Sequence, residues 1–244
     1  PQHSLLFKIH KEIFMHYTFY FGKSEIHIDK SWEEFFSLNI NKIDIKNLGN
    51  DFTPPAEKVF RVFLKPLNEI KYIILGQDPY YKRNKATGRA FEVNNVTEWT
   101  DPETKGALQS IIKSIYYHHP SKKKDVSVTI KTIRDDCEDI PKPNELFDLL
   151  ENNGVFLLNL SLTCSINQPN SHYNEWKVFS QELIKFIIKK NPSVKWFIWG
   201  THARQATQKI DEKYKISDTV HPTSRNIKVF IEESGLNKLS FLYQ

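Results

Sequence analysis

IKYIILGQDPYY, residues 70–81, joins a nearly continuous apolar run to a polar turn that contains glycine, aspartate and proline. An apolar run of this length, rich in β-branched side chains, is typical of a strand buried on both faces of a sheet. Three further runs indicate strands of the same kind, the last of them more weakly: residues 155–160, 194–199 and 215–220. The four runs together predict one central sheet.

The segments between these runs carry the spacing of amphipathic helices. Two apolar stripes recur at helical intervals: Leu108, Ile111, Ile112 and Ile115, and then Trp176, Phe179, Leu183, Phe186 and Ile187. The alternation of strands and helices predicts an α/β fold, a single domain with a central four-stranded, mainly parallel sheet flanked by helices on both faces. In such a fold the chemistry gathers beyond the carboxyl ends of the strands.

Length and composition restrict the class of protein. The 244 residues suit one α/β domain, and 39% hydrophobic with 26% charged residues excludes both a disordered chain and a membrane protein. The net charge of +5 is compatible with an anionic partner without identifying one. Cys137 and Cys164 are too few for a disulfide framework and favour a reducing compartment. The first 20 residues lack a signal-peptide pattern, so we expect no secretion.

The domain is expected to span residues 31–244, after an N-terminal extension of residues 1–30 whose first part precedes the only methionine, Met15. A helix is expected to begin at the proline pair at residues 54–55, because proline is favoured in the first helical turn. Residues 120–143 are rich in charge and predict a surface insertion whose lysines are solvated.

Polar residues follow each expected strand. Asp78, Asn159 and His221 come directly after or at the end of three of the runs, and Gly200-Thr201 follows another. A carboxylate can act as a base, an amide can read a base edge, and a helix N-terminus can bind phosphate. By itself Asp78 is better explained as part of a turn, Asn159 alone is uninformative, and a lone histidine is usually structural or exposed. Four polar strand ends at one edge of a sheet are harder to explain in that way.

At this point the segments, taken in order, resemble the uracil-DNA glycosylase family. The water-activating loop of that family is GQDPYH, and residues 76–80 match it while Tyr81 replaces the histidine. Other family motifs match in the same order: G-x-x-F-x-V at residues 88–93, LLLN-x-x-LT at residues 156–163 with Phe156 for the first leucine, NSH at residues 170–172, WG[ST] at residues 199–201, and HPS at residues 221–223 with Thr223. The resemblance runs from about residue 31 to about residue 224.

The resemblance implies an enzyme that flips uracil out of DNA and hydrolyses its N-glycosidic bond, which leaves an abasic site. Asp78 is the expected stabiliser of the sugar cation and activator of water, and His221 is expected to donate a hydrogen bond to uracil O2. The residues expected to bind uracil are those that match the pocket motifs: Gln77, Tyr80, Phe91 and Asn159. Neither a metal nor an organic cofactor is implied.

The resemblance also implies contacts with DNA phosphates. The DNA-binding candidates match or follow the last three motifs: Ser171, His172, Thr201, Thr223 and Arg225. The expected partner is single- or double-stranded DNA that contains uracil. The expected location is intracellular, in the nucleus or in the cytoplasm or nucleoid, and no association with a membrane is expected. We expect a monomer that is able to associate with a replication or repair protein.

Three departures from the family pattern leave an alternative open. Tyr81 replaces the histidine, residues 94–104 contain only Pro102 where a proline-rich loop is expected, and Arg225 stands where the family has a wedge leucine. An arginine can fill a vacated base stack but is no apolar plug. The alternative is a DNA-binding or scaffold subunit of a replication or repair complex with weak or dispensable catalysis. The joint presence of the catalytic and pocket residues argues against this alternative.

Overall fold

A four-stranded parallel sheet forms the centre of the computed structural model, which describes residues 16–136 and 138–244. Its strand order is β5-β4-β7-β8, and each neighbouring pair is parallel. The strands are β4 (Tyr72–Gly76), β5 (Val155–Asn159), β7 (Lys195–Trp199) and β8 (Lys215–Thr219). The predicted α/β class and the four predicted strands are confirmed.

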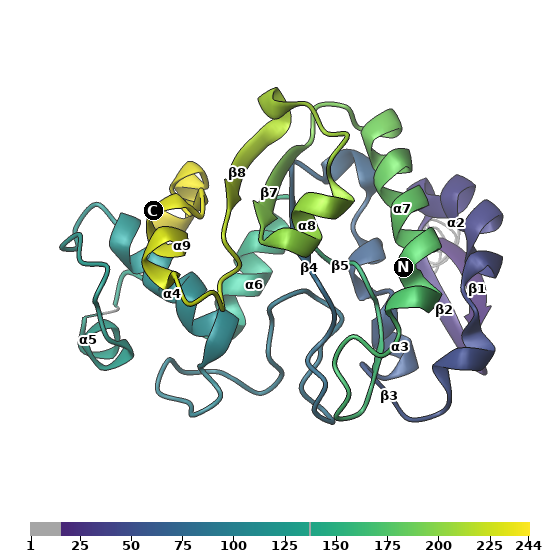
Figure 1. Ribbon diagram of the computed structural model, residues 1–244, viewed down its shortest axis with the longest axis horizontal. Coiled ribbons are helices and arrows are strands. Elements are labelled where there is room, and N and C mark those ends of the chain that lie inside the picture. The colour runs from purple at the N-terminus through teal and green to yellow at the C-terminus, as the bar shows by residue number, and fades with distance from the viewer. Residues whose placement is uncertain (1–15, 137) are drawn as a thin grey trace, which may run out of the picture.

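Two hydrophobic cores lie on the two faces of this sheet, since successive strand side chains point to opposite sides. Ile73 and Leu75 of β4 enter one core, and Ile74 enters the other. The first face is covered by α2 (Glu33–Asn39), α3 (Ala56–Val59) and α7 (Tyr173–Lys190), and the second by α4 (Gly106–His118), α5 (Ile130–Asp135), α6 (Pro143–Asn152) and α9 (Ile227–Glu233). Figure 1 shows the two groups of helices on opposite sides of the sheet.

The described part of the expected N-terminal extension packs into the same core as the rest of the domain. It is an antiparallel hairpin of β1 (His16–Phe21) and β2 (Ser24–Asp29). Alternate side chains of this hairpin are buried: Phe19, Phe21, Ile26 and Ile28. The sequence-based boundary at residue 30 overlooked this period-two pattern, which is the signal of a half-buried strand. Residues 1–15, including Met15, lie outside the described part.

Two other expectations are changed in detail. The helix after the proline pair is only α3, and a 3₁₀ turn at Arg61–Leu64 continues it. The insertion at residues 120–143 contains α5, and the side chain of Lys122 is only 7% exposed. Its ammonium lies 2.7 Å from a carboxylate oxygen of Asp136 and 3.3 Å from one of Asp139, so the expectation that the lysines there are solvated is wrong for Lys122.

The remaining elements are short. A small antiparallel pair of β3 (Phe52–Thr53) and β6 (Cys164–Ser165) joins the loop before α3 to the loop after β5, and α8 (Thr201–Ala206) follows β7. Further 3₁₀ turns are Lys30–Trp32, Ile40–Lys42, Ile45–Leu48, Leu67–Glu69, Glu212–Tyr214, Leu236–Lys238 and Ser240–Tyr243. In the ranges that the structure describes, no helix is both long enough and apolar enough to cross a membrane.

The path of the chain opens a crevice at the carboxyl edge of the sheet. The connection after β4 passes to α4 and α6 on one face, whereas the connection after β5 passes to α7 on the other. Gly76 and Asn159, the last residues of these neighbouring strands, are register partners. Because the chain leaves them in opposite directions, this is the position where open α/β sheets bind ligands.

Candidate active site

A cavity of about 620 Å³ lies in this crevice. Among the residues that line it are all six that the sequence predicts for uracil binding and catalysis: Gln77, Asp78, Tyr80, Phe91, Asn159 and His221. They come from segments that follow β4 and β8 and from the end of β5. The fold therefore brings together side chains that are far apart in the sequence.

Gly76 is required for the position of Asn159. A Cβ atom on residue 76 would overlap the side-chain amide of Asn159 and would lie 2.9 Å from the Cβ atom of Ala90. Only a residue without a side chain leaves room for the Asn159 amide beside the end of β4. Asn159 is 5% exposed, so its amide is presented by the buried wall of the cavity.

The Asp78 carboxylate is held by the loop after β5. The backbone N–H of Asn170 donates to its Oδ2 atom over 2.7 Å, and the amide of Gln77 donates to the side-chain oxygen of Asn170. Burial raises the pKa of Asp78 above its ordinary value of 3.8, while the Asn170 hydrogen bond and the charge of His202 lower it in part. Asp78 is thus a half-buried carboxylate with one oxygen already engaged.

The His221 ring has a defined hydrogen-bond partner on one side. The backbone N–H of Thr223 donates to Nδ1 over 3.2 Å, and the Thr223 hydroxyl lies 2.8 Å from the same atom. Nδ1 must therefore accept, which places the proton of the neutral ring on Nε2. Burial lowers the pKa of His221 below its ordinary value of 6.5, and the charge of His202 lowers it further. The site thus favours a neutral imidazole that donates through Nε2.

Aromatic side chains form another part of the cavity. The ring centroid of Phe91 lies 5.6 Å from that of Trp199 and 6.2 Å from that of His221. The Tyr80 hydroxyl donates to the backbone carbonyl of Phe91 over 3.4 Å. Burial, with a smaller contribution from the charge of Glu103, raises the pKa of Tyr80 to about 12, so this phenol stays protonated. Tyr80 and Phe91 thus line the same cavity and are joined by a hydrogen bond.

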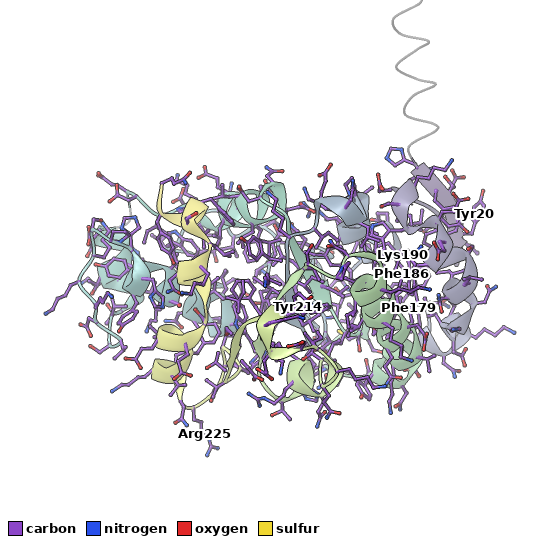
Figure 2. All side chains as sticks on the ribbon, turned by 90° about the horizontal axis from the view of Figure 1, so that it is seen from above. Tyr20, Phe179, Phe186, Lys190, Tyr214 and Arg225 are labelled. Carbon is purple, nitrogen blue, oxygen red and sulfur yellow. The ribbon has the colours of Figure 1, made fainter. Side chains whose placement is uncertain are left out.

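The residues predicted to bind DNA are placed less uniformly. Thr201 and Thr223 are exposed and line a second cavity of about 430 Å³. This cavity shares four lining residues with the first: Gly76, Gln77, His221 and Thr223. Arg225 is also exposed, and Figure 2 shows it standing out at the edge of the molecule. These three side chains are accessible beside the pocket.

Ser171 and His172 support the loop from inside. The hydroxyl of Ser171 accepts the backbone N–H of Ser165 over 2.7 Å. His172 is 3% exposed, and its ring nitrogens lie 2.8 Å from the Thr163 hydroxyl and 3.0 Å from the Ser165 hydroxyl. The structure does not bring the ring of His172 to the surface.

Several residues around the site were not predicted. His202 lines the second cavity, and its charge acts on both Asp78 and His221. Its position directly after the WG[ST] motif was the available signal. A group of charged residues lines the first cavity without having been expected: Lys82, Lys85, Glu103 and Lys105. In the described ranges no cluster of three or more His, Cys, Asp or Glu side chains could hold a metal ion.

Comparison with known proteins gives the family. The chain is 33% identical over 213 residues to the uracil-DNA glycosylase of Borrelia turicatae, which covers 82% of this chain and 85% of the relative. It is 30% identical over 211 residues to that of Campylobacter hominis, covering 81% of this chain and 80% of the relative. No family model matches the chain.

Solved structures share the fold. The crystal structure of wild-type UNG from Nitratifractor salsuginis has a TM-score of 0.71 at 23% identity, and the match covers 89% of this chain and 93% of that one. The crystal structure of mimivirus uracil-DNA glycosylase has a TM-score of 0.61 at 22% identity, and the match covers 80% of this chain and 70% of that one. The matches to the curated relatives cover most of this chain and most of each relative. This chain therefore belongs to the uracil-DNA glycosylase family.

Proposed function

We propose that the cavity after β4 receives a uracil flipped out of DNA and that Asp78 and His221 act on its N-glycosidic bond, which leaves free uracil and an abasic site. The observation that carries the proposal is the meeting of these two residues and of the four predicted pocket residues in one cavity of about 620 Å³. The glycosidic bond cannot be reached inside the base stack, so the nucleotide has to leave the duplex.

Recognition of uracil rests on three side chains. Phe91 stacks on the base, and the amide of Asn159 offers an N–H and a C=O group to uracil O4 and N3–H. Cytosine presents an amino group and an acceptor at these positions, so the same amide opposes it. Tyr80 faces C5 and leaves no room for the thymine methyl group. Steric overlap rejects thymine strongly, whereas a missing methylene contact is worth only about 1–3 kcal/mol.

Bond cleavage develops positive charge on the sugar and negative charge on the departing uracil. Asp78, with Oδ2 held by Asn170, stabilises the sugar cation and positions the attacking water. His221 donates from Nε2 to uracil O2, since Thr223 occupies Nδ1. A preorganised donor of this kind contributes about 3–4 kcal/mol to the transition state. Gln77 acts through its backbone, because its amide is engaged with Asn170.

DNA is held through its phosphates, which position the substrate without reading its sequence. Thr201 and Thr223 are the accessible hydroxyls beside the pocket, and Ser171 shapes the neighbouring loop. His172 contributes by supporting that loop, since its ring is buried. Arg225 enters the gap that the flipped nucleotide leaves. The basic balance of the chain supports binding that weakens as salt rises, and the enzyme acts as a monomer wherever DNA is present.

A uracil-release assay on single- and double-stranded oligonucleotides tests the proposal. We expect release from both substrates by the purified chain, with thymine and cytosine left in place. An inactive wild-type chain that binds DNA would contradict the proposal and favour the scaffold alternative. Full activity on single strands by the chain alone would contradict the scaffold alternative.

A further inference from the structure

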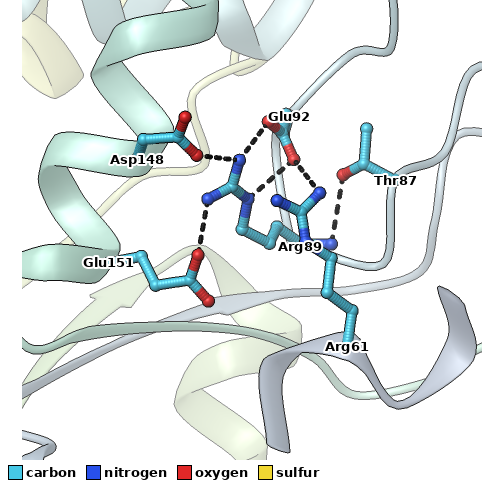
Figure 3. Close-up of polar contacts among 6 residues, drawn as sticks. All are labelled: Arg61, Thr87, Arg89, Glu92, Asp148 and Glu151. Carbon is cyan, nitrogen blue, oxygen red and sulfur yellow. Dashed lines mark hydrogen bonds and ion pairs between the residues drawn. The ribbon is translucent and has the colours of Figure 1, made fainter. Parts of the chain in front are cut away.

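Arg89 has its guanidinium among three carboxylates (Figure 3). Only 2% of its side chain is exposed. Its Nε and Nη2 atoms donate to the two oxygens of Glu92 over 2.8 and 2.5 Å. Nη2 also donates to Asp148 over 2.8 Å, and Nη1 donates to Glu151 over 2.7 Å. Arg61 approaches Glu92 from the other side at 3.5 Å. The pairs join the segment after β4 to α6.

The cluster of Arg89 with its carboxylate partners lies on both sides of Phe91 in the sequence. Arg89 and Glu92 flank Ala90 and Phe91, and the backbone of Phe91 has a φ of 66°, in the left-handed region. A bulky residue adopts that conformation only at a cost in free energy, so the surrounding structure must hold it. The backbone N–H of Ala90 also donates to the carbonyl of Leu157 over 2.9 Å. The segment is therefore anchored on both sides of the ring.

We infer that Arg89 is a positioning residue for uracil recognition, which fixes the Phe91 ring by tying its segment to Glu92 and to α6. The inference rests on the proposed function, in which Phe91 stacks on the flipped base. Positions 89 and 92 are two of the three variable positions of the G-x-x-F-x-V pattern, so the resemblance assigns neither of them a role.

The chemistry of the guanidinium explains why an arginine occupies this position. Its planar fork can engage several carboxylates at once, whereas an ammonium is a single point of charge. Burial alone would lower the pKa of Arg89, but the hydrogen bonds and charges of its three partners raise it, so the side chain stays charged. Removal of Arg89 would leave the nearly buried Glu92 with only the longer contact to Arg61. The segment would then lose its link to α6.

The test compares Arg89→Met, Arg89→Lys and Glu92→Gln with the wild-type chain and with Phe91→Ala. Binding of free uracil is measured by calorimetry, and turnover is measured on a single-stranded oligonucleotide. Both measurements are made well below each variant's melting temperature. Lys122→Met is the matched control, since Lys122 is a nearly buried cation between two carboxylates in the charged insertion. Arg89→Met is expected to weaken uracil binding and to lower kcat by about tenfold each. Arg89→Lys and Glu92→Gln fall between Arg89→Met and wild type, and Lys122→Met changes neither value by more than about twofold.

The outcomes separate the inference from the proposed function. No uracil release by the wild-type chain, or a Phe91→Ala variant with wild-type uracil binding, contradicts the proposed function itself. The inference is overturned if Phe91→Ala binds uracil more weakly while the Arg89 variants have lower melting temperatures but normal uracil binding and turnover. Arg89 would then have only a structural role. If Arg89→Met does not fold, the uracil binding and turnover of Arg89→Lys and Glu92→Gln decide the question. Lower values than in the wild-type chain support the inference, and wild-type values overturn it.

Discussion

The backbone N–H of Asn170 donates to Oδ2 of Asp78 over 2.7 Å and so joins the loop after β5 to the loop after β4. The same asparagine accepts the amide of Gln77 through its side chain. The two contacts hold the carboxylate at the cavity wall from a segment 92 residues further along the chain. An asparagine at position 78 could accept the same N–H through its side-chain oxygen. A substitution there can therefore remove the charge while the loop contact persists.

Asp78→Asn is expected to lower uracil release by at least about a hundredfold and to leave DNA binding nearly unchanged. The lost interaction is the attraction between a carboxylate and the developing sugar cation, which exists only in the transition state. Single-turnover kinetics and an equilibrium DNA-binding assay measure the two quantities. Asp211→Asn is the matched control, since Asp211 also accepts a backbone N–H, that of Lys213, at an exposed turn outside the cavity. Unchanged turnover in Asp78→Asn would remove this residue from the mechanism.

The pH dependence of kcat/KM is expected to show an acid limb above pH 3.8, with a plateau at higher pH. The active form needs Asp78 ionised and His221 neutral. Burial raises the pKa of Asp78 above 3.8 and lowers the pKa of His221 below 6.5, so the loss of activity through protonation of Asp78 has its midpoint above pH 3.8. Rate measurements on single-stranded DNA across pH 4 to 8 locate the limb. Activity that stays constant down to pH 4 would contradict the raised pKa of Asp78.

His202→Asn is expected to move that acid limb to higher pH. A protonated His202 lowers the pKa of Asp78 and of His221, so its removal raises both. Asp78 then takes up a proton, and His221 becomes charged, at a higher pH than in the wild-type chain. His27→Asn, at an exposed position of the N-terminal hairpin, is the control and should leave the profile in place. A limb that stays fixed, or moves to lower pH, would contradict this electrostatic coupling.

Tyr80→Ala is expected to release thymine from normal DNA, because it opens the space beside C5 of the base. Tyr80→Phe keeps the ring and loses only the 3.4 Å hydrogen bond to Phe91, so it should retain the discrimination. Released bases are measured by chromatography after incubation with uracil-free DNA. An active Tyr80→Ala variant that still releases uracil alone would show that another group excludes the methyl.

Asn159→Asp is expected to weaken the selectivity for uracil and to permit release of cytosine. An ionised carboxylate only accepts hydrogen bonds, which suits the exocyclic amino group of cytosine and opposes the carbonyl at uracil O4. Asn39→Asp places a carboxylate at another buried asparagine, outside the cavity, and controls for lost stability. Normal uracil release without detectable cytosine release would mean that Asn159 does not read the base.

Arg225→Leu is expected to speed uracil release from double-stranded DNA and to change release from single strands by no more than about threefold. A leucine enters the vacated stack without losing the hydration of a guanidinium, and single strands need no such plug. The salt dependence of binding should decrease by up to about one phosphate contact. Rates on matched single- and double-stranded substrates test this. Equal losses on both would identify Arg225 as a general backbone contact.

Local patterns in the chain determine the sheet and most of the pocket residues. The apolar run at residues 70–75 became β4 (Tyr72–Gly76), and the run at residues 155–160 became β5 (Val155–Asn159). Strands of a parallel sheet are buried on both faces, so they appear as continuous apolar runs that need no partner to be recognised. Asp78, Asn159 and His221 follow from their places at strand ends and from short motifs around them.

Tertiary structure alone decides how these residues are held. The Asn170 contact to Asp78, the charge of His202 near both catalytic candidates and the tie between Arg89 and α6 join segments that no local pattern relates. The burial of Lys122 has the same origin, because its two carboxylates become neighbours only after α5 has folded back beside it. Periodicity reports which face of one segment is apolar. The partner of a polar or charged side chain depends on which distant segment packs against it, and that is settled only when the whole chain has folded.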